Sequence, residues 1–458
     1  MSTTLIPDLL AQRHAFSDPV VRERGYDVPV RRIEIAGGLI SAGPALLRAM
    51  SLGSRYLLVA DENTYRIAGG ALSRSLTRSN DFHIEEVVLP GSGKSTREVV
   101  NSLLTSASQV DALVAVGSGT INDITKLAAY EAGKPYAVFG TAPSMNGYVS
   151  ANASIEEKGQ KKTVPARAPV AAFFDLDVLQ NAPLRLLVSG FGDCLCRSTA
   201  QTDWWLSHIL LGTPYLEAPF ELLEAAERRL FASAKDIGSR TAGVVRALTE
   251  TLILSGIGMT ICGGSMPASQ GEHLISHYLE LMHPLSALHG EQVAVATLAM
   301  ARLQDSILSR PHPPTFTRTY DDGHLIRDHF GPGRAPEIRS DYEAKARHIV
   351  QAGLAKKANG MHWPETWKTG TARLRAFRFA ADELHHLALA AGCPTTPAEI
   401  GLSDSAFAEA VHFARLIRGR FTSLDIAAMD DDADNLLAKC LAPGEDSSNL
   451  LIHERIVV

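Results

Sequence analysis

Short apolar runs alternate with amphipathic stretches through the first third of the chain. Helical periodicity over 64–78, 95–108 and 120–132 separates runs that are rich in β-branched and aromatic residues and bounded by turn residues. Strands that alternate with helices at this spacing predict a parallel sheet covered by helices on both faces, with ligands at the carboxyl ends of the strands. The predicted strands are RYLLVADEN (55–63), FHIEEVVLP (82–90), DALVAVGSG (111–119), KPYAVFGTAPS (134–144) and PVAAFFDLD (169–177).

After about residue 176 the pattern changes to long helical periodicity without a convincing strand, so the second part of the chain is predicted to be all-helical. The stretch between 308 and 342 contains RPHPPTF and FGPGRAP, and its prolines and glycines predict an extended loop. We therefore expect an N-terminal extension over 1–28, an α/β domain over 29–178 and an all-α domain over 179–458. The predicted helices are 184–211, 219–235, 241–262, 270–282, 289–308, 341–357, 370–391 and 403–418.

Composition narrows the class of protein. A chain of 458 residues exceeds the size of one typical core, and its net charge of −6 offers no basic field for nucleic acid. The five cysteines are few and widely spread, which favours a reducing cytoplasm, and no secretory signal begins the sequence. The uncharged run 251–271 has the length of a membrane span, but its Gly, Ser, Thr and Pro content favours a buried helix and a turn. The expected partners are small molecules and other copies of the chain, in a homo-oligomer.

Two glycine-rich loops follow predicted strands. PGSGKST (90–96) lacks the first glycine of the G-x-x-x-x-G-K-[ST] phosphate loop, because Val88 stands in its place, and instead predicts a turn in which Ser95 or Thr96 caps a helix. In AVGSGTINDITK (115–126), small residues at 117–119 lead from a strand into a helix. Backbone amides at such a helix start can bind a pyrophosphate, although a plain packing turn has the same pattern.

Two further loops belong to the same edge of the predicted sheet. Asp61 follows a strand directly, where a carboxylate can accept hydrogen bonds from a ribose, or can instead cap the next helix. The loop TAPSMNGYVSANAS (141–154) combines hydroxyl groups with small residues after the fourth strand. Polar loops in this position tend to contact a ligand.

Four histidines lie within GEHLISHYLELMHPLSALHGEQ (271–292). A capping box, Ser269-x-x-Glu272, predicts that a helix starts near 270 and carries His273 and His277 one turn apart on one face. A proline at 284 should end this helix and let the chain double back, which would bring His289 toward His273.

A carboxylate would complete a metal site with these imidazoles. Asp193 in SGFGDCLCR is the most attractive donor, in what reads as a glycine-flanked turn at a helix start. One carboxylate with two imidazoles leaves coordination positions open, as in catalytic zinc or ferrous sites. Cys194 and Cys196 form a C-x-C pair without a second pair at ligand spacing, so we interpret them as two thiols on a helix.

The order of these motifs resembles one family. LLVADENTY, VGSGTINDITK, TAPSMNGYVS, FGDCLCRSTAQTDWWLSH and SQGEHLISHYLELM with LHGEQV follow one another over roughly residues 30–300. Their order is similar to that in the iron-dependent alcohol dehydrogenase superfamily, in its glycerol-1-phosphate dehydrogenase branch. The resemblance implies a Rossmann-like domain that binds NAD or NADP and a helical domain that holds one divalent ion, whether zinc, nickel or iron. The implied reaction interconverts a small phosphorylated polyol and its ketone, sn-glycerol 1-phosphate and dihydroxyacetone phosphate.

The resemblance also assigns roles to single residues. It makes Asp193, His273 and His289 the metal ligands and places His277 against the substrate, whereas it gives His283 no role. The residues that it implies for cofactor contacts are Asp61, Gly117, Ser118, Gly119, Thr120, Asn122, Asp123, Thr141, Ser144 and Ser150.

This chain departs from the family pattern at two positions. Ser118 replaces a glycine, and Asn146, in the expected catalytic set with Asp193 and His277, replaces an aspartate. An amide can bond a substrate hydroxyl but cannot accept its proton, so either the proton moves through His277 and water or the substrate is a different polyol. A sugar-phosphate cyclase or lyase like dehydroquinate synthase is the alternative, but only Lys126 and Arg197 offer cations for a phosphate near the motifs.

Overall fold

The computed structural model describes residues 3–4, 29–91, 94–157, 160–283, 285–310, 312–316, 323–354 and 362–441. The chain divides into two compact units, the first made of 1–194, 216–265 and 390–392, the second of 195–215, 266–389 and 393–458. This division differs from the boundary expected at 178, because residues 216–265 join the sheet-containing unit. Arg246 of that segment donates a hydrogen bond of 2.7 Å from Nη1 to the carbonyl of Ile35, in a strand of the sheet.

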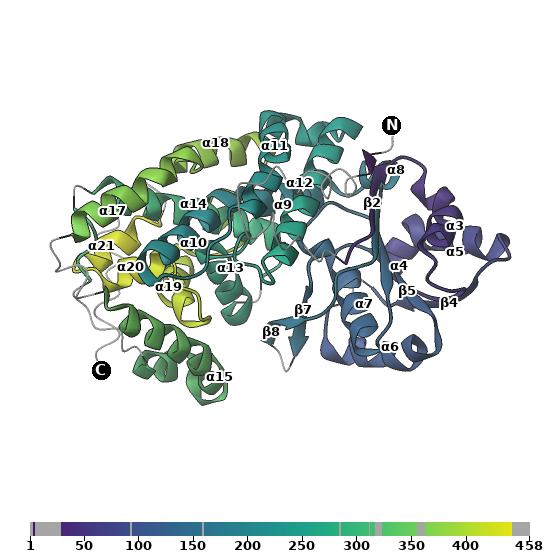
Figure 1. Cartoon of the computed structure of the whole chain (residues 1–458), viewed down its shortest axis with the longest axis horizontal. Helices are drawn as coiled ribbons and strands as arrows, with labels where there is room; N and C mark the ends of the chain where they lie inside the picture. The colour runs from purple at the N-terminus through teal and green to yellow at the C-terminus, as the bar shows by residue number, and fades with distance from the viewer. Residues whose placement is uncertain are drawn as a thin grey trace. The chain divides into compact units, whose positions relative to one another are not determined.

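The first unit is built on a sheet of parallel strands in the order β2-β9-β6-β5-β3-β4, with β1 (Thr3–Thr4) antiparallel at the β2 edge (Figure 1). All five predicted strands are confirmed, whereas β2 was missed. Because β4 and β5 lie on opposite sides of β3, the order in which successive strands join the sheet reverses there, and a crevice is expected at the carboxyl ends of β3 and β5. The strands are β2 (Arg32–Ala36), β3 (Arg55–Asp61), β4 (His83–Leu89), β5 (Ala112–Gly117), β6 (Tyr136–Gly140) and β9 (Ala171–Asp175).

Helices cover this sheet much as the periodicity predicted. α3 (Leu39–Met50) and α5 (Gly70–Arg78) bury leucines in one core with the strands, and α7 (Gly119–Glu131) packs against β5 with α6 (Arg97–Gln109) beside it. α4 (Glu62–Thr64) and the π-helical turn η2 (Tyr65–Gly69) precede α5. Thr96 caps α6 by accepting from the amide of Val99 at 3.4 Å, so the capping interpretation of PGSGKST is confirmed. α3, with Pro44 inside it, was missed.

The rest of the first unit is a hairpin and a group of helices. The hairpin, β7 (Asn152–Glu157) with β8 (Gln160–Pro165), was not predicted. α12 is the one described helix long and apolar enough to cross a membrane, and 72% of its most apolar window is buried, as expected for a core helix. The helical elements are η3 (Gly147–Val149), α8 (Leu176–Leu179), α9 (Leu184–Leu195), α11 (Ala218–Ala232), η4 (Ala234–Ser239) and α12 (Ala242–Ile261).

The second unit is helical throughout its described residues, as predicted. One expectation for it is wrong: much of the stretch from 308 to 342 is helix, not an extended loop. α15 covers Gly323–Ala352 with a break at Gly331, whose φ is 71°. Pro332 follows that break at the first position of the second segment, where a missing N–H is tolerated best, and Pro336 lies one turn further along.

Most of the remaining helical elements of this unit contribute side chains to one apolar core. They are α10 (Arg197–Leu211), α13 (Gly271–Met282), α14 (His289–Ser309), α17 (Trp363–Ala372), η5 (Arg373–Ala376), η6 (Ala398–Ile400), α19 (Asp404–Phe413), η7 (Ala414–Leu416), α20 (Ser423–Met429) and α21 (Ala433–Ala438). A further helix is α18 (Ala381–Ala391).

Candidate functional site

The two loops predicted to bind a cofactor lie against each other at the carboxyl edge of the sheet. The amide of Thr141, after β6, donates to the carbonyl of Gly117, at the end of β5, at 3.1 Å. A Cβ at position 117 would lie 2.5 Å from Cβ of Ile121, so the chain can turn from β5 into α7 this tightly only with glycine. The sequence therefore specifies both the turn and the meeting of the loops.

The start of α7 is open to an anionic ligand. Ser118 is the N-cap residue, but its side chain makes no capping hydrogen bond in the structure. The amides of Gly119 and Thr120 belong to the first turn, where a helix supplies no internal acceptor. A Cβ on Gly119 would lie 3.3 Å from Cγ of Met145, so this glycine also admits the loop that follows β6.

Asp61 lies at the same edge, because β3 pairs with β5 in register (Val59 opposite Ala115). Its carboxylate oxygen Oδ1 accepts a hydrogen bond of 2.8 Å from the amide of Thr64, and the amide of Asp61 donates to the Thr64 hydroxyl. The interpretation of Asp61 as a helix cap is thus confirmed. A ribose contact stays a prediction.

Three of the residues implied for the cofactor have structural partners instead. Asn122 is completely buried and accepts from the Tyr136 hydroxyl at 3.3 Å, so a direct contact with a cofactor is not supported. Asp123 accepts from the Ser154 amide at 3.0 Å, and Ser150 donates to the carbonyl of Gly147 at 3.0 Å. Each of these side chains makes a hydrogen bond within the protein, and the bonds of Asp123 and Ser150 hold the loop in place.

Lys126 holds the loop after β6 by hydrogen bonds to its backbone. Its ammonium is fully buried and donates to the carbonyl oxygens of Gly147 at 2.7 Å and Asn152 at 2.8 Å. Burial lowers its pKa, and the nearby Asp123 partly offsets this. A lysine engaged in this way is a structural clamp and does not offer its charge to a substrate phosphate.

Two glycines admit the loop that carries Asn146. A Cβ at Gly190 of α9 would lie 1.9 Å from the carbonyl oxygen of Pro143, and a Cβ at Gly256 of α12 would lie 2.5 Å from that of Asn146. Any side chain at either position would push this backbone away. Neither role was predicted from the sequence, although Gly190 belongs to the motif SGFGDCLCR.

Asn146 is thereby bonded to Asp193. Its amide N–H donates to Oδ2 of Asp193 at 2.8 Å, and its side-chain Nδ2 lies 3.4 Å from Oδ1. Asp193 is 2% exposed and lies in the last turn of α9, so its expected place in a turn at a helix start is wrong. Gly190 serves close packing of the helix instead of a turn.

Three of the four clustered histidines come together as predicted. α13 ends at Met282 and α14 begins at His289; the proline at 284 lies outside the described residues. The ring centroids of His273 and His289 are 5.2 Å apart, and that of His277 lies 6.0 Å from the first and 6.2 Å from the second. The fourth histidine, His283, lies beside Tyr278 instead, with the two ring centroids 6.5 Å apart.

The start of α13 differs in detail from the predicted capping box. Gln270 is the N-cap residue, and Ser269 instead accepts a hydrogen bond of 2.8 Å from Arg420. Glu272 bends back to accept from the amide of Gln270 at 2.7 Å. The start of α13 was therefore predicted to within one residue, but the residue that Glu272 caps is Gln270 and not Ser269.

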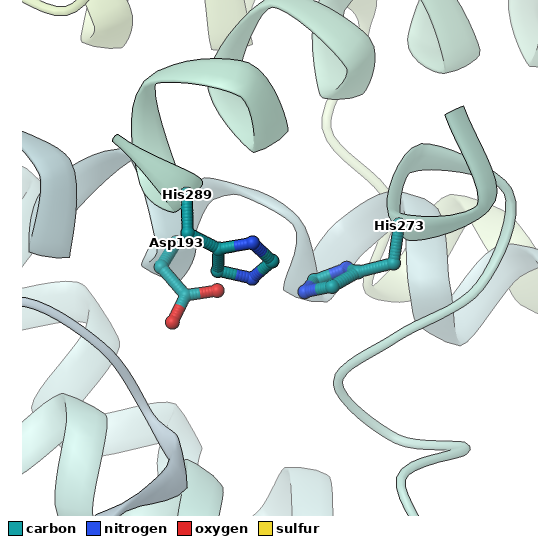
Figure 2. A group of neighbouring side chains, drawn as sticks. All are labelled: Asp193, His273 and His289. Carbon is teal, nitrogen blue, oxygen red and sulfur yellow. The ribbon is translucent and has the colours of Figure 1, made fainter. Parts of the chain in front are cut away.

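The donor set of the expected metal site is present. Each of Asp193, His273 and His289 offers a ligand atom, and these atoms all lie within 4.8 Å of one another. Figure 2 shows the carboxylate and the two imidazoles turned toward a common point. An oxygen and two nitrogen donors suit a borderline divalent ion and leave further coordination positions open.

His277 has an environment that keeps it uncharged. Burial holds its pKa well below the ordinary value, with Arg418 and the other two imidazoles lowering it further against the opposing effect of Glu280. Arg418 follows η7, which packs against α13. Arg418 was not predicted from the sequence, because it is far from His277 along the chain.

Comparison with known proteins places these observations in a family. A family model described as iron-containing alcohol dehydrogenase matches residues 34–183. The glycerol-1-phosphate dehydrogenase [NAD(P)+] of Bacillus subtilis is 33% identical over 344 residues, which cover 73% of this chain and 83% of that protein. The enzyme of the same name from Halalkalibacterium halodurans is 37% identical over 255 residues, and the match covers 54% of this chain and 64% of that one.

Solved structures agree on the fold. A probable glycerol dehydrogenase from Sinorhizobium meliloti matches with a TM-score of 0.58 at 20% identity, covering 88% of this chain and 96% of that one. An iron-containing alcohol dehydrogenase from Corynebacterium glutamicum matches with a TM-score of 0.57 at 15% identity, covering 93% and 98%.

Proposed function

Because the chain belongs to the iron-containing alcohol dehydrogenase family, we propose that it is an NAD(P)-dependent dehydrogenase of a small phosphorylated polyol. The proposed reaction interconverts sn-glycerol 1-phosphate and dihydroxyacetone phosphate. The observation that carries the proposal is the convergence of Asp193, His273 and His289. The names of the relatives from Bacillus subtilis and Halalkalibacterium halodurans support the substrate.

The loops at the sheet edge would hold the cofactor. The pyrophosphate would lie over residues 117–120, at the uncapped start of α7, and Thr141 and Ser144 would approach it from the next loop. A bound NAD(P)H would supply the hydride that reduces the carbonyl carbon of the ketone. A proton then goes to the carbonyl oxygen, so the products are the polyol phosphate and NAD(P)+.

Asp193, His273 and His289 would hold one divalent ion, whether zinc, nickel or iron. The bound ion supplies Lewis-acid chemistry to the carbonyl group. The residues fit it, because their donor atoms lie within 4.8 Å of one another and two of the three side chains are buried. Asn146 holds the carboxylate of Asp193 by two N–H contacts, which leaves other lone pairs of that carboxylate for the ion.

His277 would carry the proton. Its depressed pKa keeps the imidazole neutral near pH 7, so it can accept a proton at one nitrogen while it releases another from the second. Asn146 cannot take that role, because an amide does not accept a proton at this pH. A water relay through His277 therefore replaces the carboxylate that the family has at position 146.

We propose that Arg418 receives the substrate phosphate. Its positive charge acts on His277, the imidazole proposed to face the substrate. The loop that carries it is fastened to the start of α13, because Arg420 donates to the Ser269 hydroxyl at 2.8 Å. A guanidinium suits a phosphate, with which it can form two parallel hydrogen bonds.

A cyclase or lyase of the dehydroquinate synthase type is the weaker candidate. The two cations that such an enzyme would use to bind a phosphate here are both engaged in hydrogen bonds within the protein. Lys126 donates to the carbonyl of Gly147, and Arg197 donates to Gln201 at 2.8 Å and to the carbonyl of Phe377 at 2.9 Å. A dehydrogenase of another polyol is the alternative that Asn146 keeps open. Self-association and a cytoplasmic location are also proposals, resting on composition.

The test is net oxidation of NADH or NADPH with dihydroxyacetone phosphate by the zinc-, nickel- or iron-loaded protein. The proposal expects stoichiometric oxidation with the phosphate ester and far less with dihydroxyacetone. Arg418→Gln should raise KM for the ester at least tenfold and leave the weak activity on dihydroxyacetone unchanged. Product formation without net cofactor oxidation would instead indicate a cyclase or lyase, and equal activity on both ketones would contradict a phosphorylated substrate.

A further inference from the structure

Each imidazole of the proposed metal centre has a glutamate of α13 at its Nδ1 atom. Nδ1 of His273 lies 3.0 Å from Oε1 of Glu272, and Nδ1 of His289 lies 3.7 Å from Oε1 of Glu280. A carboxylate oxygen accepts hydrogen bonds, so Nδ1 of His273 must carry the proton in its contact with Glu272. The distance between Glu280 and His289 is longer than a hydrogen bond, and there the negative charge of Glu280 favours the same tautomer. The tautomer with the proton on Nδ1 leaves the lone pair of Nε2 for a cation.

We propose that Glu272 and Glu280 are positioning residues that fix these two imidazoles with Nε2 directed at the metal ion. The inference rests on the proposed metal centre, because without an ion the orientation has no target. It adds two residues that neither touch the ion nor contact the substrate. Both belong to the same helix as His273 and His277.

The contact of Glu272 is unusual for a helix, because side chains of consecutive residues point in different directions. It forms because Glu272 occupies the first turn of α13 and bends back, so that Oε1 accepts from both the Gln270 amide at 2.7 Å and His273. Its other oxygen, Oε2, accepts from the Thr199 hydroxyl at 3.0 Å. The carboxylate is completely buried, and the positive end of the helix dipole favours its charge.

These contacts also argue against Glu272 as a metal ligand. A donor atom each of Cys196, Glu272 and His273 lies within 4.8 Å of the others, which is compatible with a second ion. Both carboxylate oxygens, however, already accept hydrogen bonds, and the thiol of Cys196 donates to the carbonyl of Ala268 at 3.4 Å. The group is therefore a hydrogen-bonded support for His273.

Glu280 acts across the turn between α13 and α14. No described side chain makes a hydrogen bond to Nδ1 of His289, so Glu280 is the acceptor available to it. The contact is longer than that of Glu272, and the imidazole of His289 is 28% exposed. Its effect on the ion should therefore be the smaller of the two.

The test measures the dissociation constant for Zn²⁺ of the purified protein by competition with a chromogenic chelator, without any assay of turnover. Loss of an outer hydrogen-bond partner of a ligand costs about tenfold to a hundredfold in metal affinity. Glu272→Gln keeps the acceptor but loses the charge, so we expect a rise of about tenfold. Glu272→Ala loses both, and we expect about a hundredfold; Glu280→Gln should cost about threefold to tenfold.

Glu409→Gln is the matched control. Glu409 accepts a hydrogen bond from the Tyr278 hydroxyl on another face of α13, and its Oε1 lies 3.7 Å from Nε2 of His329, a histidine outside the cluster. Its replacement should leave the zinc affinity within twofold. The visible bands of the Co²⁺-loaded protein should change in Glu272→Ala and stay as in the wild type in Glu409→Gln.

The outcomes separate this inference from the proposed function. A wild-type chain that binds no divalent ion would remove the metal centre itself. Wild-type zinc affinity in folded Glu272→Gln and Glu280→Gln would overturn only the positioning roles, and so would a complete loss of binding in Glu272→Gln, because Glu272 would then be a ligand. If Glu272→Ala does not fold, the less buried Glu280→Gln and the conservative Glu272→Gln still decide the matter.

Discussion

Asn146 shows how one amide changes the electrostatics of a site. Its Nδ2 lies 3.4 Å from Oδ1 of Asp193, at a position where the family resemblance implies an aspartate. A negative charge at that distance from Asp193 would repel it unless a cation lay nearby. The amide therefore holds Asp193 in place without adding charge.

The first prediction concerns Asn146→Asp. If protons move through His277 and water, a carboxylate at 146 is not needed, and turnover on dihydroxyacetone phosphate should rise by no more than a few fold. Steady-state kinetics of the metal-loaded variant give the answer. A hundredfold gain would show that this chain has diverged from that substrate.

The second prediction separates the clustered histidines. His273→Ala should lose both bound metal and hydride transfer while the protein still binds NADH, because the loops proposed for the cofactor belong to the first unit. His283→Ala should retain both, because its ring lies near Tyr278 and outside the donor set. Metal analysis of the two purified variants checks this, and a full complement of metal in His273→Ala would contradict the assignment.

At the scale of elements, glycines decide which backbones can touch. Gly117 permits the tight turn from β5 to α7, and Gly190 and Gly256 let the loop after β6 lie on α9 and α12. None of the three has a positive φ. Their importance comes from the space that a side chain would occupy, so substitution should displace a functional loop before it unfolds a helix.

The third prediction tests the start of α7. Gly119→Val places a branched side chain against Met145 and over the uncapped amides, and should raise the dissociation constant for NADH at least tenfold. Fluorescence titration measures it. Gly243→Val is the control, because Gly243 lies in the first turn of α12 with no atom within 4 Å of the added Cβ. Equal affinity in both variants would remove this loop from the cofactor site.

The fourth prediction concerns how α13 is held by α15 and α19. The Tyr278 hydroxyl bonds both His329 and Glu409, and the ring of His329 stacks on Phe413 with centroids 3.7 Å apart. Burial lowers the pKa of His329 from 6.5, with Glu409 partly opposing it. As pH falls below 6.5 the unfolded chain therefore takes up this proton before the folded chain does, and the free energy of unfolding decreases.

His329→Gln should consequently lose less stability than the wild type between pH 7 and pH 5, as measured by urea denaturation at each pH. His386→Gln, an exposed position on α18, is the control and should follow the wild type. If all three proteins lose stability in parallel, His329 does not contribute to the pH dependence.

At the scale of the whole molecule, the reactivity of the five cysteines reports how well each unit is packed around them. Cys194, Cys196, Cys393 and Cys440 are buried, and Cys262 at the end of α12 is partly exposed. Burial raises the pKa of Cys393 and of Cys440 to about 12, so almost no reactive thiolate is present at pH 8.

The fifth prediction follows: an aromatic disulfide reagent at pH 8 should titrate one thiol per native chain rapidly and five after denaturation. Cys262→Ser should abolish the rapid phase. Two or more rapid thiols in the native wild type would show that one of the units opens more readily than its burial implies.

Much of the architecture was determined by local sequence signals. The strand runs, the helix spacing and the turn 117–119 are readable along the chain, because they depend on the periodicity of neighbouring residues. The same holds for His273 and His277, which the helical repeat places on one face. The return of His289 was also predictable, since a proline beyond the first turn of a helix removes a backbone N–H and clashes with the preceding turn, which favours a helix end. The motif FGPGRAP was wrongly interpreted as part of a loop, because glycine and proline can stand between two consecutive helices as well as in a loop.

Only the tertiary structure decided which distant groups meet. Asn146 and Asp193 are 47 residues apart, and they are bonded because glycines on α9 and α12 admit the intervening loop. Asn122 and Lys126 stand in a motif typical of cofactor contacts, yet burial turns both toward the protein. Glu272 could be read as a capping residue, but its contact with His273 depends on a side-chain rotamer that periodicity does not specify. Sequence patterns encode which face a residue occupies, whereas distances between side chains depend on packing over the whole chain.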